Sequence, residues 1–230
     1  MTRRIYLFSV YHNLFIAVFI LSTICPVSAQ VAIDDSYNPK VPEPVYDEGK
    51  GPVVAVDKAH NNYHTADQRY KPFASLLKRD GYRVIHNEKL FSLDALEDLD
   101  VLVIANPLSI QNRRIGSLQE PTALSFAFTE EEITSVRTLV ENGGSLFLIA
   151  DHTPFASAAK DLAKAFGVEF TDGFAMAGHW NRWSQNTFNF KTGLKECAVT
   201  LGRSKKELVE KVVTFAGSAF KAPNDAIPVL

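Results

Sequence analysis

Short apolar runs that alternate with stretches of helical periodicity constrain the fold of this chain more than any other feature. The apolar runs are predicted strands and cover residues 53–56, 82–86, 101–105 and 145–150. Helical spacing is found over residues 70–79, 92–99, 129–142 and 155–166. Thr129 and Glu132 have the spacing of a capping box at the start of the third of these helices. This alternation is typical of a parallel sheet with crossover helices. We therefore expect an α/β fold with a mainly parallel sheet; if its arrangement is flavodoxin-like, the strand order is 2-1-3-4 plus edge strands.

The N-terminal 29 residues have the composition of a secretory signal peptide. Arg3 and Arg4 precede a short apolar segment, and a small-residue cleavage site ends at Ala29. An uncleaved membrane anchor is one alternative, although the apolar run is shorter than the ~20 residues that a span needs. A lipoprotein modified at Cys25 is another, but the bulky Ile24 precedes that cysteine. We expect cleavage, no stable membrane span afterwards, and export to the periplasm or the extracellular space.

The mature chain would be mildly acidic and poor in cysteine. Without Arg3 and Arg4 the formal net charge of −2 becomes −4, which argues against a nucleic-acid partner. Only Cys197 remains, so no intramolecular disulfide is expected. Residues 30–51 contain several Pro and Gly residues and no periodicity, which predicts a linker or an extended arm. The α/β domain is predicted to occupy residues 52–230.

The second half of the chain is less regular. Residues 108–128 are predicted to form a long loop, a short strand is expected at 168–170, and residues 207–215 fit either a helix or a strand. From residue 172 we expect irregular chain with a polar and aromatic cluster at residues 179–183, which suits either a ligand pocket or a packed flap. The apolar run at 226–230 predicts a strand cut short, as in a fragment of a longer protein.

Two of the predicted strands end in Asp and His residues. The first is followed by Asp57, His60 and His64, and the fourth by Asp151 and His152. Right-handed crossovers place the carboxyl ends of parallel strands at one edge of the sheet, where ligands bind in open α/β folds. We therefore predict that these five residues form one site, to which Asn106, after the third strand, lies close.

Three interpretations of the Asp/His set remain open. Imidazole and carboxylate groups bind zinc, manganese or iron, and His60, His64 and His152 are the predicted metal ligands. Alternatively, Asp57 or Asp151 orients a histidine for general acid–base catalysis. In the third, structural interpretation, the same residues only cap turns and helices. Arg113 and Arg114 are further candidates for gripping an anion.

Three blocks of the sequence carry a family resemblance. They are VVAVDKAHNNYHTADQRYKPFASLLKRDGYRVI, DVLVIANP and FTEEEITSVRTLVENGGSLFLIADHTPF. Over residues 52–172 the chain resembles a bacterial domain-of-unknown-function family of the class I glutamine amidotransferase-like superfamily. It is similar in pattern to ThuA-like proteins and to auxiliary domains of gliding-motility ABC transport systems. The resemblance implies a flavodoxin-like fold that is a three-layer sandwich, and a site at Asp57, His60 and His152, but no specific activity.

The functional hypotheses follow from the site and the N-terminus. Amidotransferases of the superfamily carry a Cys at the turn where this chain has Ala150-Asp151-His152, which argues against glutaminase activity. The first hypothesis is an exported hydrolase-like enzyme, with or without a divalent metal, that acts on a carbohydrate or a cell-envelope component. The second is a non-catalytic exported module that binds a small polar ligand, an envelope component or a transport partner. The sequence does not indicate an oligomeric state.

Overall fold

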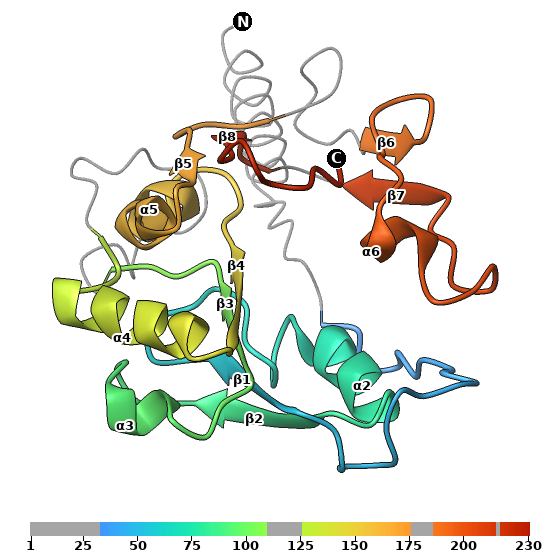
Figure 1. Cartoon of the computed structure of the whole chain (residues 1–230), viewed down its shortest axis with the longest axis horizontal. Coiled ribbons are helices and arrows are strands. Elements are labelled where there is room, and N and C mark those ends of the chain that lie inside the picture. The colour runs from blue at the N-terminus through green and yellow to red at the C-terminus, as the bar shows by residue number, and fades with distance from the viewer. Residues whose placement is uncertain (1–32, 110–125, 176–185, 215–216) are drawn as a thin grey trace, which may run out of the picture. The chain divides into compact units, whose positions relative to one another are not determined.

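A four-stranded parallel sheet forms the centre of the protein. The computed structural model describes residues 33–109, 126–175, 186–214 and 217–230. The main sheet consists of β1 (Val53–Asp57), β2 (Arg83–Asn87), β3 (Val101–Ala105) and β4 (Ser145–Ile149). Its strands lie in the order β2-β1-β3-β4, and every neighbouring pair is parallel (Figure 1). The order predicted for a flavodoxin-like sheet is therefore confirmed.

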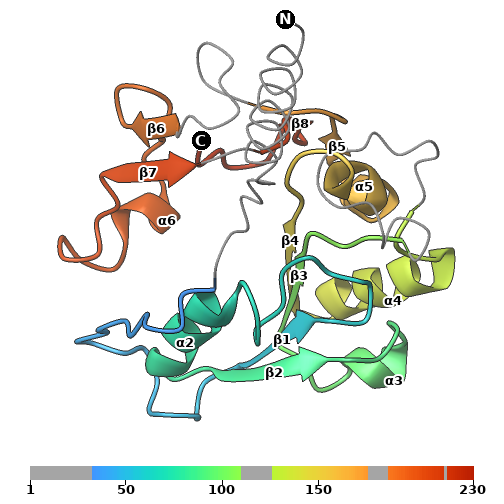
Figure 2. The same ribbon diagram turned by 180° about the vertical axis from the view of Figure 1, so that it is seen from behind.

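Helices cover both faces of this sheet. The helix α2 (Lys71–Arg79) lies on one side, whereas α3 (Leu93–Leu96), α4 (Glu130–Glu141) and α5 (Phe155–Ala165) lie on the other (Figures 1 and 2). Successive side chains of a strand point to opposite faces. Val54 and Val56 accordingly pack with the α2 layer, while Ala55 belongs to the core under α3, α4 and α5. The protein is a three-layer α/β sandwich, as predicted.

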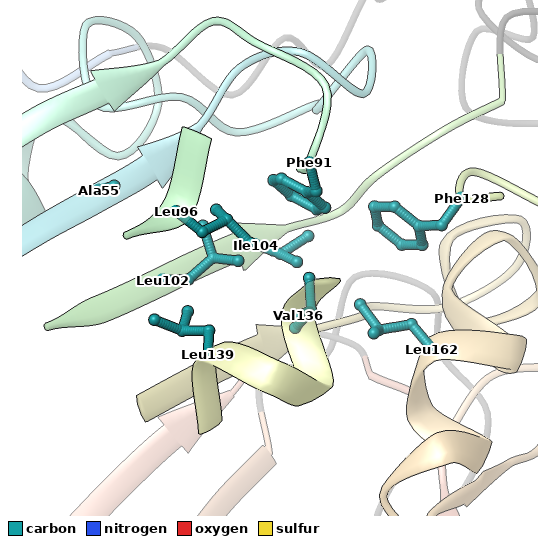
Figure 3. Packing of buried hydrophobic residues seen from close by; sticks show 9 residues of the cluster. All are labelled: Ala55, Phe91, Leu96, Leu102, Ile104, Phe128, Val136, Leu139 and Leu162. Carbon is teal, nitrogen blue, oxygen red and sulfur yellow. The ribbon is translucent and has the colours of Figure 1, made fainter. Parts of the chain in front are cut away.

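The larger core lies between the sheet and the three helices. Leu102 and Ile104 of β3 meet Val136 and Leu139 of α4 and Leu162 of α5 (Figure 3). Phe91 and Phe128 close this core at the carboxyl end of the strands, with their ring centroids 5.7 Å apart. Burying several large apolar side chains, each contributing about 1.5–3 kcal/mol, is what fixes the helices on this face.

Side-chain caps define where two of the helices begin. Thr129 and Glu132 form the predicted capping box of α4, each accepting a hydrogen bond from the backbone N–H of the other. Ser92 caps α3 by accepting from the N–H of Ala95. The helix expected over residues 92–99 is nevertheless short, because α3 ends at Leu96.

The C-terminal third differs from the sequence prediction in three respects. β5 (Glu169–Phe170) pairs with β8 (Phe220–Lys221), and β6 (Asn186–Asn189) pairs with β7 (Lys211–Thr214), so these strands form two small antiparallel sheets apart from the main sheet. The 207–215 segment thus contributes a strand, and α6 (Ala198–Leu201) is an additional short helix. The strand expected at 226–230 is absent: the segment pairs with no strand, and Pro228 has no N–H to donate.

Residues 33–52 contain neither helix nor strand and are attached near the turn between α2 and β2. The N–H groups of Val45 and Tyr46 donate to the side chain and the backbone carbonyl of Asp80, and the Tyr46 and Tyr82 rings meet edge to face. The predicted signal peptide lies outside the described residues. Within the described segments, no helix has the length and apolar character needed to span a bilayer.

Two glycines after helix ends provide a matched test of this attachment. Gly81 and Gly143 follow α2 and α4 with φ angles of +95° and +99°. A Cβ at Gly81 would lie 2.2 Å from the Tyr46 carbonyl oxygen, whereas a Cβ at Gly143 would have no atom within 4 Å. We expect Gly143→Ala to lower the free energy of unfolding by about 1–2 kcal/mol through backbone strain alone. Gly81→Ala should lose about 1–3 kcal/mol more through the steric clash.

Urea unfolding of the two variants and the parent chain measures the difference. Equal losses in the two variants would show that residues 45–46 do not lie against Gly81 in solution.

Candidate functional site

His60 is buried between two carboxylates. Its Nδ1 lies 2.8 Å from Oδ2 of Asp57, the last residue of β1, and its Nε2 lies 2.8 Å from Oε1 of Glu132 in the first turn of α4. Asp57 and His60 are 0% and 3% exposed. The second oxygen of Asp57 accepts from the N–H of Ala59 and from the side-chain amide of Asn87. Every polar atom of the imidazole therefore has a protein partner.

The two carboxylates favour the imidazolium form of His60. A neutral imidazole donates from only one nitrogen, whereas both His60 nitrogens face acceptors. Burial by itself lowers the pKa of His60, but the hydrogen bonds and negative charges of Asp57 and Glu132 outweigh it, so the pKa is raised. Burial tends to raise the pKa of Glu132, but hydrogen bonds from the Thr129 N–H and from His60 leave that pKa lowered. The group is a charged, hydrogen-bonded triad.

This triad is enclosed by aromatic rings. The His60 ring centroid lies 4.3 Å from that of Phe91 and 4.7 Å from that of Phe128, the two rings seen side by side in Figure 3. The Phe91 N–H also donates to Glu132. A ligand would have to displace a carboxylate or a phenyl ring to reach His60. The arrangement therefore matches the structural interpretation of Asp57 and His60. Their catalytic role stays a prediction, and the geometry does not support it.

The predicted metal ligands His60, His64 and His152 do not form one ligand group. Within the described ranges, no three or more His, Cys, Asp or Glu side chains are grouped so as to hold a metal ion. The physical reason is that both nitrogens of His60 are already hydrogen-bonded, and Nδ1 of His152 donates to the carbonyl of Thr153, 2.7 Å away. The three histidines do not fit a shared metal centre.

Asn106 connects the loops that follow β1, β3 and β4. Its carbonyl accepts from the Tyr63 N–H, its N–H donates to the Ile149 carbonyl, and its side-chain oxygen accepts from the Asp151 N–H at 2.8 Å. Asn106 is 1% exposed and has a φ of +49°, a conformation that Asn tolerates better than most residues. A buried asparagine thus places the β1 loop beside the Asp151 turn.

A second group of polar residues surrounds His64. Its ring contacts Tyr63 and Tyr70, with centroid distances of 5.1 and 4.8 Å. Burial lowers the pKa of His64, the Arg69 charge lowers it further, and the Asp151 charge opposes both, leaving a net decrease. Burial and the Asp151 charge also raise the pKa of Tyr70. His64 and Asp151, predicted from separate strand ends, are therefore electrostatic neighbours, and His64 is neutral at pH 7.

Three nitrogen atoms in this loop are buried and have no hydrogen-bond partner among the residues that the structure describes. They are Nδ2 of Asn62, Nδ1 of His64 and Nε of Arg69. The Asn62 oxygen accepts from the His60 N–H, which identifies the unpaired atom as the amide donor. Arg69 lies over the Tyr63 ring, with Cζ 4.1 Å from the centroid. Buried polar atoms nearly always have a partner, so this concentration within eight residues makes the group the candidate site.

His152 is connected to this group through aromatic rings. It stacks on Phe174 at 4.4 Å and contacts Phe155, which in turn contacts Tyr63. The Asp151 side chain accepts from the His152 N–H. His152 therefore lies at one end of an aromatic row that reaches His64 through Phe155 and Tyr63. The structure divides the five predicted residues into the enclosed pair Asp57 and His60 and the group His64, Asp151 and His152.

Several residues that form the triad or the group around His64 are not among the predicted site residues. Glu132 was identified only as a helix cap, and Asn62, Arg69 and Tyr70 were not singled out for the site. The concentration of polar residues in the 57–70 loop was the available signal, whereas the contact between His60 and Glu132 joins residues 72 positions apart. The candidates Arg113, Arg114 and the cluster at 179–183 lie outside the described residues.

An open cavity of about 640 Å³ lies elsewhere, beside β2 and α3. It is lined by Ile85, Asn87, Lys89 and Leu99 among others, and none of the five predicted site residues contributes to it. Because it contains no unpaired buried polar atom, we place the candidate site at the group around His64 instead.

The charged triad can be tested by removing the imidazole. His60→Ala leaves two buried carboxylates without their shared cation, and we expect a loss of about 3–5 kcal/mol in the free energy of unfolding. Because the pKa of His60 is raised, its contribution to the free energy of unfolding is complete below pH 6.5, the ordinary histidine pKa. This contribution declines as the pH rises through the raised pKa. The contribution of Glu132 to the free energy of unfolding is complete above pH 4.5, the ordinary pKa of a glutamate. It declines as the pH falls through the lowered pKa of Glu132.

The difference between parent and variant should therefore be largest between about pH 4.5 and 6.5, measured by urea unfolding at a series of pH values. His86→Ala, at an exposed histidine of β2, is the control and should change stability by less than about 0.5 kcal/mol. If His60→Ala and His86→Ala were equally stable, the triad would contribute nothing.

Comparison with known proteins supports the fold but no family. No protein-family model matches the chain, and no curated protein matches it. The N-terminal domain of mmIFT52 has a similar structure, with a TM-score of 0.56 and 11% identity over 77% of this chain and 71% of that one. A putative ThuA-like protein from Bacteroides uniformis ATCC 8492 is also similar, with a TM-score of 0.41 and 15% identity over 76% of this chain and 64% of that one. At these identities, the first of the two likenesses shows a shared fold and nothing about activity.

Proposed function

We propose that this protein binds a small polar ligand at the group around His64. The observation that carries the proposal is the set of three buried, unpaired nitrogens on Asn62, His64 and Arg69. Leaving a buried donor or acceptor unpaired costs about 1–3 kcal/mol, so a loop that keeps three of them is unfavourable by itself. A ligand that supplied the missing partners would recover that free energy on binding.

The location of the group agrees with this role. It lies where the loops after β1, β3 and β4 meet, at the carboxyl ends of parallel strands. In open α/β sheets this edge is the usual ligand site. The aromatic row from Tyr70 to His152 places rings beside the polar atoms, and the combination of rings and hydrogen-bonding groups suits a carbohydrate. The protein would thus act as a binding module for a sugar or a similar envelope component.

The second candidate function is a hydrolase that uses His64 as a general base. The lowered pKa of His64 favours this candidate, because a base must be unprotonated at working pH. The nearby Asp151 charge would stabilise the imidazolium that forms when His64 accepts a proton. In this mechanism His64 takes the proton from water, while Asn62 and Arg69 hold the substrate. No metal is part of this mechanism.

Export and family membership belong to the proposal as well. The N-terminal pattern around Arg3, Arg4 and Ala29 supports secretion to the periplasm or the extracellular space. The three sequence blocks support membership of the bacterial domain family within the class I glutamine amidotransferase-like superfamily. The protein would accordingly bind its ligand outside the cytoplasm.

Ligand binding can be measured on the full chain with a panel of small molecules. Neutral sugars, amino sugars, uronic acids and sugar phosphates are screened by the shift in unfolding temperature and confirmed by calorimetry. We expect at least one class to bind saturably, and Asn62→Ala or His64→Ala to weaken it by roughly tenfold for each hydrogen bond lost. Ser36→Ala, on an exposed segment, is the control. If no class bound, or if both site variants bound as the parent does, the proposal would be wrong.

The hydrolase candidate predicts a specific pH response. Because Asp151 raises the pKa of His64 and Arg69 lowers it, Asp151→Asn should lower that pKa further and Arg69→Gln should raise it. Histidine NMR titration measures both shifts without a substrate. Once a substrate is known, the acid limb of the rate profile should follow the same pKa, and His64→Ala should reduce the rate by about 10²–10⁴. An acid limb that did not move in Asp151→Asn would contradict the role of His64 as base.

A further inference from the structure

We propose that the ligand carries an oxyanion group, such as a carboxylate or a phosphate, and that Arg69 and Asn62 bind it. This inference rests on the proposed ligand site and adds the chemical class of the ligand. It begins from the charge of Arg69. The guanidinium is partly buried, yet it forms no ion pair with any carboxylate in the described part of the chain.

The other contacts of Arg69 leave its charge without a counter-ion. Its Nη1 donates to the Tyr63 carbonyl at 3.4 Å, a long hydrogen bond to a neutral group, and its Cζ lies over the Tyr63 ring. These two contacts fix the plane of the guanidinium. They leave Nε, a buried donor that carries part of the positive charge, with no acceptor.

The unpaired atoms select the chemistry of the ligand. Arg Nε is always a donor, and Nδ2 of Asn62 is a donor because Oδ1 already accepts from the His60 N–H. Two of the three unpaired nitrogens can therefore be satisfied only by acceptors. An oxyanion offers several acceptor lone pairs and a negative charge, and charge-assisted hydrogen bonds to guanidinium are the strong ones.

The backbone holds the donors close together. Tyr63 lies between Asn62 and His64 in sequence, Arg69 stacks on the Tyr63 ring, and the Tyr63 N–H is anchored to the Asn106 carbonyl. The Gln68 and Tyr70 N–H groups both donate to the Thr65 carbonyl, which folds the loop back on itself. The loop is thus held in shape without using the three unpaired nitrogens.

Nearby carboxylates do not occupy this position. Asp67 pairs with Lys58 and accepts from Thr65, and Glu132 is bonded to His60. Asp151 influences His64 and Tyr70, but it forms no ion pair with Arg69. An incoming anion would therefore meet no described carboxylate that already pairs with Arg69. It would also favour protonation of His64, whose charged neighbours are Arg69 and Asp151.

Sulfate is the probe for this inference, because it carries the same charge throughout pH 5–8. Equilibrium dialysis of the full chain with radiolabelled sulfate, at constant ionic strength in chloride, measures specific binding. We expect one saturable site, with affinity that rises as pH falls and His64 becomes protonated. Arg69→Gln should weaken sulfate by roughly tenfold to a hundredfold, and Arg69→Lys by less, since it keeps the charge but not the Nε donor.

The matched control is Arg137→Gln, which removes an exposed arginine of α4 that pairs with Glu141. It should bind sulfate as the parent does. Absence of saturable sulfate binding, or equal affinity in Arg69→Gln and the parent, would overturn the inference. If neutral sugars then still bound in a manner that required Asn62 and His64, only the oxyanion assignment would fail. If nothing bound, the ligand site itself would be wrong.

Discussion

The hydrogen-bonded triad of Asp57, His60 and Glu132 is the interaction on which the carboxyl edge of the sheet depends. It joins the end of β1 to the first turn of α4, two elements in different layers of the sandwich. The backbone of His60 extends the connection, since its carbonyl accepts from the Leu108 N–H after β3 and its N–H donates to Asn62. His60, through its side chain and its backbone, and Asn106 together anchor the loop that carries the candidate site.

Two histidines four positions apart on this loop have opposite electrostatic environments. His60 lies between two carboxylates, which favour its protonated form, whereas burial and the Arg69 charge favour the neutral form of His64. The first has no free polar atom, and the second has an unpaired nitrogen. One polar loop thus contains both a fully hydrogen-bonded histidine and a histidine with an unpaired nitrogen. Asn106 then brings Asp151 beside the second histidine.

The fold was predictable from the sequence because its signals are local. Strand and helix periodicity, and the capping box of Thr129 and Glu132, each depend on neighbours within a few positions. The crossover rule then places the carboxyl ends of the strands at one edge, and the order 2-1-3-4 is that of a flavodoxin-like sheet. The site was predictable only as a location, at the ends of β1 and β4. The pairing of Glu132 with His60 depends on the docking of α4, and no local pattern encodes it. The sequence does not predict β6 and leaves β7 as either a helix or a strand. The reason is similar, because each of these strands forms by pairing with the other.

The Asp57–His60–Glu132 contact also bears on the order in which the chain folds. It joins residues separated by 72 positions, with α2, β2, α3 and β3 between them. Closing so long a loop is entropically unfavourable until neighbouring elements have already come together. A charged contact that needs close geometry from both β1 and α4 gains little from a loosely collapsed chain. We therefore expect the triad to form after the folding transition state, so that it slows unfolding rather than accelerating folding.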